Sequence, residues 1–271
     1  MSTATAPSTL ASVLADLSAE GVDLDALVSA DGVDLTTPTP APGWTIGHQL
    51  GHLRWTDELT VLTCTDPAGF RAALSRLTDA SGIARAIEGG ARLGAGTPAE
   101  ELLASWRAGR VAVIDALCRV PSGTRLEWIG PPMGAGTMAS ARIMETWAHG
   151  QDIADALGVL RTPTDRLRHV ADLGVRTRDH AFRTNGLPVP SDPFRIELTA
   201  PSGAIWSWGP PAATETVVGP AVDFALLVTQ RRHPADLELT ATGPLAEHWM
   251  TIAQAFAGAP GAGRIPQAEC P

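Results

Sequence analysis

The chain has 271 residues, of which 44% are hydrophobic and 18% are charged, so it can bury a sizeable core and general disorder is disfavoured. Its net charge of −9 argues against a protein that holds nucleic acid or an anionic membrane surface through basic side chains. No apolar run approaches the ~20 residues of a membrane span, and the N-terminus lacks the pattern of a signal peptide. We therefore expect a cytoplasmic protein.

Residue usage excludes several reaction types. All 20 basic residues are arginine and there is no tyrosine, so mechanisms that use a Schiff-base lysine or a tyrosine acid or base are excluded. The three cysteines, Cys64, Cys118 and Cys270, form no CxxC pair. Neither a disulfide framework nor a cysteine zinc site is expected.

Helical patterns dominate the first 160 residues, which we take as one domain (1–160). Ser8 is the expected N-cap of a first helix. Thr45 is the expected N-cap of a second helix, which follows a proline-rich segment. A capping box that starts at Thr97 opens a third helix, and a fourth ends at a glycine C-cap, Gly158. Four helices predict a bundle, in which sites lie between facing helices.

Residues 161–271 change character and predict a small α/β domain. Strict alternation of apolar and polar residues predicts strands, and longer apolar-periodic stretches predict helices. The expected helices cover 161–183, 220–230 and 244–256, and the expected strands cover 194–199, 204–208, 217–218 and 237–240. The predicted fold class is therefore α + α/β.

Three side chains in the helical domain could bind a metal. Glu145 and His149 lie four residues apart on the fourth expected helix, so they project from one face, and His52 lies on the second helix. Two histidines and one carboxylate are the protein ligands of many catalytic zinc sites, which keep a fourth position open. Asp152 could accept the free imidazole N–H of His149, and His48 is a rival or additional ligand.

Explanations that involve no metal stay open for the same residues. A Glu/His pair at this spacing is common on a solvated helix face, and His52 could be an interior histidine that only forms hydrogen bonds with its neighbours. The segment 134–139 matches the weak form of a dinucleotide fingerprint, but it leads directly into the helix of Glu145 without a βαβ unit. We therefore interpret it as the loop that enters this helix.

Two motifs resemble the mycothiol-dependent maleylpyruvate isomerase family, whose N-terminal domain is a DinB-like metal-binding bundle. The first is Gly43-Trp44-Thr45 followed by His52-Leu53, and the second is Glu-x-x-x-His-Gly-x-Asp over residues 145–152. The segments 199–203, 224–232 and 253–258 are similar to an actinobacterial branch of that family whose activity is unassigned. The resemblance covers nearly the whole chain and implies that His52, Glu145 and His149 bind a divalent metal.

The resemblance also implies a cofactor and a layout. The metal is zinc in most relatives, with nickel or iron as alternatives, and the thiol cosubstrate is mycothiol. In the isomerase of this family, the C-terminal domain resembles sterol-carrier-type α/β folds. That domain covers the metal cleft and supplies a catalytic arginine. Arg231 is the position that we carry over, with Arg232 as its neighbour, although either could be only a surface charge.

A thiol that reaches an open metal position loses its proton, because the cation stabilises the thiolate. The thiolate would then add to a small electrophile, for transfer or for isomerisation, and arginines suit a substrate that bears a carboxylate. Two alternatives remain at this stage. One is a hydrolase that uses metal-bound water, and the other is a non-catalytic protein that binds the metal and an apolar ligand.

Overall fold

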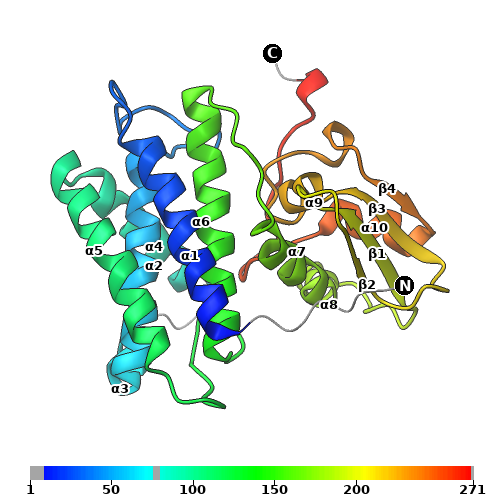
Figure 1. Cartoon of the computed structure of the whole chain (residues 1–271), viewed down its shortest axis with the longest axis horizontal. Coiled ribbons are helices and arrows are strands. Elements are labelled where there is room, and N and C mark those ends of the chain that lie inside the picture. The colour runs from blue at the N-terminus through cyan, green and yellow to red at the C-terminus, as the bar shows by residue number, and fades with distance from the viewer. Residues whose placement is uncertain (1–8, 76–79, 270–271) are drawn as a thin grey trace. The chain divides into compact units, whose positions relative to one another are not determined.

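The computed structural model describes residues 9–75 and 80–269 and divides the chain into two compact units, Met1–Leu160 and Arg161–Pro271. The first unit is helical, and the second contains a small sheet with its helices (Figure 1). The helices of the first unit are α1 (Leu10–Val28), α2 (Ile46–Thr65), α3 (Pro67–Leu74), α4 (Ala80–Ala95), α5 (Ala99–Cys118) and α6 (Ala135–Leu157).

Helix α2 lies at the centre of the helical unit, where it packs against α4, α5 and α6, while α1 packs against α5 and α6. Leu117, Met138 and Ile143 belong to one buried cluster of apolar side chains. Leu50 and Trp106 belong to a second cluster, which surrounds the N-terminal half of α2. The half of α2 that carries His52 is therefore fixed by packing against several neighbours.

Several helix boundaries differ from the sequence-based expectation. Ser8, the expected first cap, lies outside the described residues, and the hydroxyl of Thr9 accepts the N–H of Ser12 instead. Thr97 does not cap α5, because its hydroxyl donates to the carbonyl of Leu93 in the preceding helix. Helices α3 and α4 were not predicted at all. The glycine C-cap of α6 is confirmed, since Gly158 has a φ of 64°.

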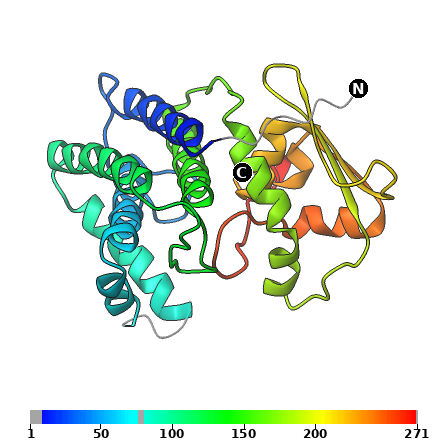
Figure 2. The same cartoon turned by 60° about the horizontal axis from the view of Figure 1, so that its bottom comes forward.

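The second unit is built on a four-stranded sheet with the order β2-β1-β3-β4, in which β1 and β3 are parallel and the other neighbours antiparallel. Figure 2 gives a second view of this sheet and its helices. Helices α9 and α10 pack against this sheet, and α7 and α8 pack against α9 and α10 respectively. The elements are α7 (Leu167–Arg176), α8 (Arg178–Thr184), β1 (Phe194–Thr199), β2 (Ile205–Trp208), β3 (Glu215–Pro220), α9 (Ala221–Val228), η1 (Pro234–Asp236), β4 (Thr240–Thr242), α10 (Pro244–Ile252) and η2 (Gln267–Glu269).

Two predictions for this unit are corrected. The single helix expected over 161–183 is two helices, because the chain breaks at Thr177, whose hydroxyl lies within hydrogen-bond distance of the carbonyls of Leu173 and Gln254. The strand expected over 237–240 begins only at Thr240, after the short 3-10 turn η1. A helical N-terminal region followed by a small sheet domain is otherwise the architecture that the sequence predicts.

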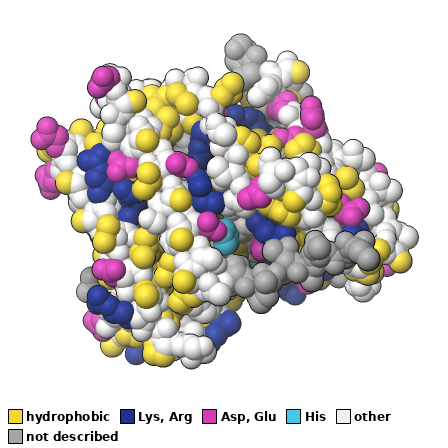
Figure 3. Space-filling model, in the orientation of Figure 1, with side chains coloured by type: hydrophobic (Ala, Val, Ile, Leu, Met, Phe, Trp, Pro, Cys, Tyr) yellow, Lys and Arg dark blue, Asp and Glu magenta, His cyan; other side chains and the backbone are white. Residues whose placement is uncertain are grey.

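The described surface is chemically mixed. Figure 3 shows acidic and arginine side chains scattered among apolar ones on the described part of one face. None of the helices in the described ranges combines the length and the apolar character that crossing a membrane requires.

Candidate metal centre

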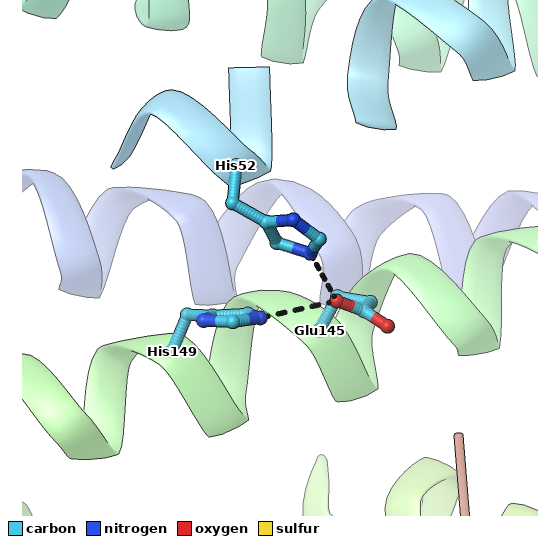
Figure 4. Close-up of side chains that lie close together, drawn as sticks. All are labelled: His52, Glu145 and His149. Carbon is cyan, nitrogen blue, oxygen red and sulfur yellow. Dashed lines mark hydrogen bonds and ion pairs between the residues drawn. The ribbon is translucent and has the colours of Figure 1, made fainter. Parts of the chain in front are cut away.

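His52, Glu145 and His149 come together between α2 and α6 (Figure 4). Oε2 of Glu145 lies 3.1 Å from Nε2 of His52 and 3.3 Å from Nε2 of His149. Each residue offers one ligand atom, and these three atoms lie within 4.8 Å of one another. Glu145 and His149 project from the same face of α6 because four residues are about one helical turn.

The spacing of these atoms suits a small cation. Ligand atoms that sit 2.0–2.1 Å from a tetrahedral zinc ion are about 3.3 Å apart, which matches the two distances to Oε2 of Glu145. Nδ1 of His52 is buried, and it has no hydrogen-bond partner among the described residues. The donor set of two imidazoles and one carboxylate therefore fits zinc in number and type, and both distances to Glu145 fit in length.

The charge state of Glu145 also favours a cation. Burial disfavours the charged form of this carboxyl, but the hydrogen bonds to His149 and His52, together with the charges of both rings, outweigh burial. The pKa of Glu145 is therefore held well below its usual range. The carboxyl is a carboxylate at neutral pH, which is the form that binds a metal.

A buried ion pair joins the two helices that carry the candidate ligands. Arg142, on α6, donates to Oδ1 of Asp57, on α2, at 3.0 Å, and both side chains are buried. Arg142 precedes Glu145 by three residues, so the pair lies about one helical turn from the triad. It ties α2 to α6 next to the place where their ligands meet.

Two tryptophans flank the histidines. The indole of Trp44 stacks on His149, with ring centroids 6.0 Å apart, and lies 5.6 Å from His52. Nε1 of Trp44 donates to Oε2 of Glu88, on α4, which fixes the indole. The ring of Trp55 lies 6.3 Å from that of His52. Aromatic side chains are therefore part of the surroundings of the triad.

The other predicted site residues have separate positions. Nδ1 of His48 accepts the backbone N–H of Thr45 at 3.2 Å, so His48 serves the N-terminus of α2 and is not among the three clustered ligands. Asp152 is buried on α6, and its predicted role at His149 stays a prediction. Arg231 and Arg232 belong to the second unit, directly after α9.

Sequence reasoning missed one residue at the site. The side-chain oxygen of Gln49 lies within hydrogen-bond distance of Nδ1 of His149, and Gln49 is completely buried. Its signal was present, because Gln49 is a polar residue three positions before His52, between the buried Ile46 and Leu50. A fully buried polar side chain next to a candidate ligand needs a partner, and that partner indicates its role.

Comparison with known proteins agrees with this architecture. Residues 17–154, just over half of the chain, match the family described as mycothiol maleylpyruvate isomerase N-terminal domain. Residues 190–242 match a second family, described as wyosine base formation. Two crystal structures, of the mycothiol-dependent maleylpyruvate isomerase and of one of its mutants, superpose with a TM-score of 0.57 over 86% of this chain and 93% of theirs. Their identity to this chain is 15% and 14%, so they show a shared fold.

Two curated relatives are much closer in sequence. The uncharacterized proteins MT0041 and Rv0036c, from two strains of Mycobacterium tuberculosis, are each 54% identical to this chain over 252 residues. The aligned region covers 93% of this chain and 97% of each relative. With the family match across the helical unit, these findings identify the chain as a member of the mycothiol-dependent maleylpyruvate isomerase family.

Proposed function

We propose that the chain is a divalent-metal-dependent enzyme that activates a low-molecular-weight thiol, mycothiol, for transfer to a small electrophile or for isomerisation of it. The observation that carries this proposal is the convergence of His52, Glu145 and His149 on one point between α2 and α6. The family supports the choice of thiol, because the isomerase whose fold it shares is named as mycothiol-dependent.

The chain's own residues have distinct tasks in this proposal. His52, Glu145 and His149 would hold the metal, for which zinc fits the donor set, and a bound divalent metal would favour the thiolate form of an incoming thiol at neutral pH. Trp44 and Trp55 restrict access of water to one side of the triad. The carboxylate of Glu145 lowers the net positive charge of the loaded site and stays ionised because its pKa is low.

An open coordination position supports an enzyme over a purely structural metal site. Structural zinc sites have four protein ligands, whereas catalytic sites have three and leave one position for substrate. The described part of the chain brings three candidate ligand atoms together, and His48, the predicted rival or additional ligand, is not among them. A metal held by these three side chains would leave one position for a thiol.

The nucleophile comes from outside the chain. Burial raises the pKa of the Cys64 thiol to about 11, so at neutral pH this cysteine is protonated and inert. Cys118 is exposed at the end of α5 and is not among the clustered side chains, and Cys270 lies outside the described residues. A borrowed thiol is the simplest source of a thiolate.

We further propose that Arg231, with Arg232 beside it, binds a carboxylate of the electrophile. Arginine suits this role because its guanidinium binds a carboxylate in a bidentate manner. In this proposal the helices α1, α2, α5 and α6 are the DinB-like four-helix core, and the second unit is a sterol-carrier-like domain. The packing of α2 against α5 and α6, and of α1 against the same two helices, supports the first of these assignments.

Metal content tests the proposal directly. Protein purified without a histidine tag is analysed by mass spectrometry after incubation with zinc and removal of the excess. We expect one equivalent of zinc in the wild type, little in Glu145→Ala and His149→Ala, and one equivalent in the control His248→Ala, whose side chain is exposed. An absence of zinc from the wild type would contradict the proposal.

The thiol is tested next, with mycothiol as the probe. Ultraviolet absorbance of the thiolate is followed as mycothiol is added to zinc-loaded and zinc-free protein at pH 7. We expect thiolate only with zinc-loaded wild type. Products from maleylpyruvate, used as the first electrophile, are then compared with and without mycothiol. Turnover that needs zinc but no thiol would favour a hydrolase that uses metal-bound water.

A further inference from the structure

We propose that Gln49 is a positioning residue, which keeps a proton on Nδ1 of His149 and so leaves Nε2, the nitrogen that faces Glu145, as the one that can bind a metal. It does so through a chain of hydrogen bonds that runs from His149 through Gln49 and Thr39 to the backbone carbonyl of Trp44. The inference deepens the proposed function and rests on it, since a directed lone pair is what a metal requires of a histidine ligand.

The direction of the chain is fixed at the Trp44 end. The carbonyl oxygen of Trp44 accepts both the backbone N–H of Thr39 at 2.8 Å and its hydroxyl at 2.9 Å. A carbonyl can only accept, so the single hydroxyl proton of Thr39 is used there. The oxygen of the same hydroxyl is then available only as an acceptor.

Gln49 has one orientation that satisfies this acceptor. Its amide Nε2 donates to Oγ1 of Thr39 at 2.9 Å, which places the amide oxygen at the other end, against Nδ1 of His149. The orientation of a glutamine amide is normally assigned from its network, and here the Trp44 carbonyl decides it. Because the amide oxygen only accepts, Nδ1 of His149 must be the donor.

The consequence appears on the other side of the imidazole ring. In a neutral ring with a proton on Nδ1, Nε2 has a lone pair, and this atom lies 3.3 Å from the carboxylate oxygen of Glu145. A lone pair and a carboxylate that face each other are stabilised only by a cation, which is a proton or a metal ion. The relay thus preorganises His149 as a ligand before a metal arrives.

Burial and aromatic stacking strengthen this chain of hydrogen bonds. Gln49 is completely buried, so water does not compete for its amide. The residue whose carbonyl ends the chain, Trp44, also stacks its indole on His149 with an interplanar angle of 18°. The carboxylate of Glu88 accepts the indole N–H of Trp44, which fixes the orientation of the ring. The segment from Thr39 to Gln49 therefore sets the proton position and the plane of one imidazole.

Zinc affinity of paired variants tests the relay. Gln49→Met removes the acceptor at similar length, and we expect its Kd for zinc to be weaker by about 10- to 100-fold. Thr39→Val removes the hydroxyl that orients the amide, and we expect a loss of roughly threefold or more. Thr39→Ser keeps the hydroxyl and should bind zinc within about twofold of the wild type. Circular dichroism confirms that each variant is folded.

The position of the proton is measured separately by ¹⁵N nuclear magnetic resonance of histidine-labelled wild type, with and without zinc. We expect a protonated Nδ1 on His149 in both states. An Nδ1 without a proton overturns the inference, and so do folded Gln49→Met and Thr39→Val variants that bind zinc as tightly as the wild type. If the wild type binds no zinc, the proposed function fails, while the Nδ1 proton still decides whether the relay exists.

Discussion

At the scale of single residues, the triad depends on how burial and charge are balanced. Glu145 is only partly exposed, and burial alone would favour its neutral form, but two imidazoles contact the same carboxylate oxygen and keep it ionised. Asp57 shows the opposite outcome. Burial raises the pKa of the Asp57 carboxyl, although the neighbouring Arg142 acts in the other direction. The ion pair of Asp57 is therefore sensitive to the loss of Arg142, the cation to which it is hydrogen-bonded.

We predict that Arg142→Met destabilises the protein by about 3 kcal/mol at pH 8, because it leaves the carboxylate of Asp57 buried without its partner. The pKa of Asp57 is already raised in the folded state, and removal of Arg142 raises it further. A raised folded-state pKa means that the folded protein binds more protons, so stability falls as the pH rises. Urea unfolding at several pH values should therefore show a smaller loss near pH 5 than at pH 8.

The double variant Asp57→Asn, Arg142→Met is the control for this prediction. It removes both charges, so most of the lost stability should return at pH 8. A double variant as unstable as Arg142→Met alone would mean that the loss comes from packing around Arg142 and not from the unpaired carboxylate.

At the scale of elements, the position of α2 depends on a close crossing with α4. A Cβ atom placed on Gly94 would lie 2.2 Å from Cα of Gly51, and one on Gly51 would lie 2.7 Å from Cα of Gly94. The two backbones thus touch where neither residue has a side chain. Since His52 follows Gly51 directly, this contact fixes the position, against α4, of the turn of α2 that carries a candidate ligand.

We predict that Gly94→Ala destabilises the protein by about 1–3 kcal/mol, because the added methyl group must push α4 away from α2. Gly89→Ala is the matched control on the same helix. Nothing lies within 4 Å of a Cβ at Gly89, so the variant should gain up to about 1 kcal/mol from the helix propensity of alanine. Thermal unfolding of both variants measures the difference, and equal effects at the two positions would contradict the role of the crossing.

This crossing also explains why α4 could not be predicted from the sequence. Its glycines reduce helix propensity, and the contact that compensates for them joins Gly94 to Gly51, more than 40 positions earlier in the chain. The split at Thr177 has a similar origin, because the carbonyl of Gln254 that its hydroxyl reaches lies far along the chain. Local patterns contain no information about such distant partners.

The triad was predictable for the opposite reason. Glu145 and His149 form a local pair on one helix, and His52 belongs to a motif with a recognisable neighbourhood. Gln49 was not predicted, because its role depends on the proline-rich segment that folds back to place Thr39 beside it. Ligands are specified by their own spacing, whereas the residues that orient them are specified by tertiary structure.

At the scale of the whole molecule, the residues proposed to bind the metal and the arginine proposed to bind the substrate belong to different units. All three candidate ligands and the Gln49 relay belong to the first unit, while Arg231 belongs to the second. Gln230, just before Arg231, has a φ of 59°, and the N–H of Arg231 donates to the carbonyl of Leu226 at 2.8 Å. This left-handed turn ends α9 and determines where the arginine backbone emerges.

We therefore predict that Arg231→Ala leaves zinc binding unchanged but lowers thiol-dependent turnover by about 10- to 100-fold, the loss expected when a charged hydrogen bond to a substrate carboxylate is removed. Zinc Kd and kcat/KM with maleylpyruvate and mycothiol are measured on the same preparations, with the exposed Arg183→Ala as the control for loss of one positive charge in the second unit. Turnover equal to that of the wild type would remove Arg231 from the proposed reaction. Loss of zinc from Arg231→Ala would instead show that the second unit contributes to the metal centre. Metal binding and substrate recognition would then not be separate tasks of the two units.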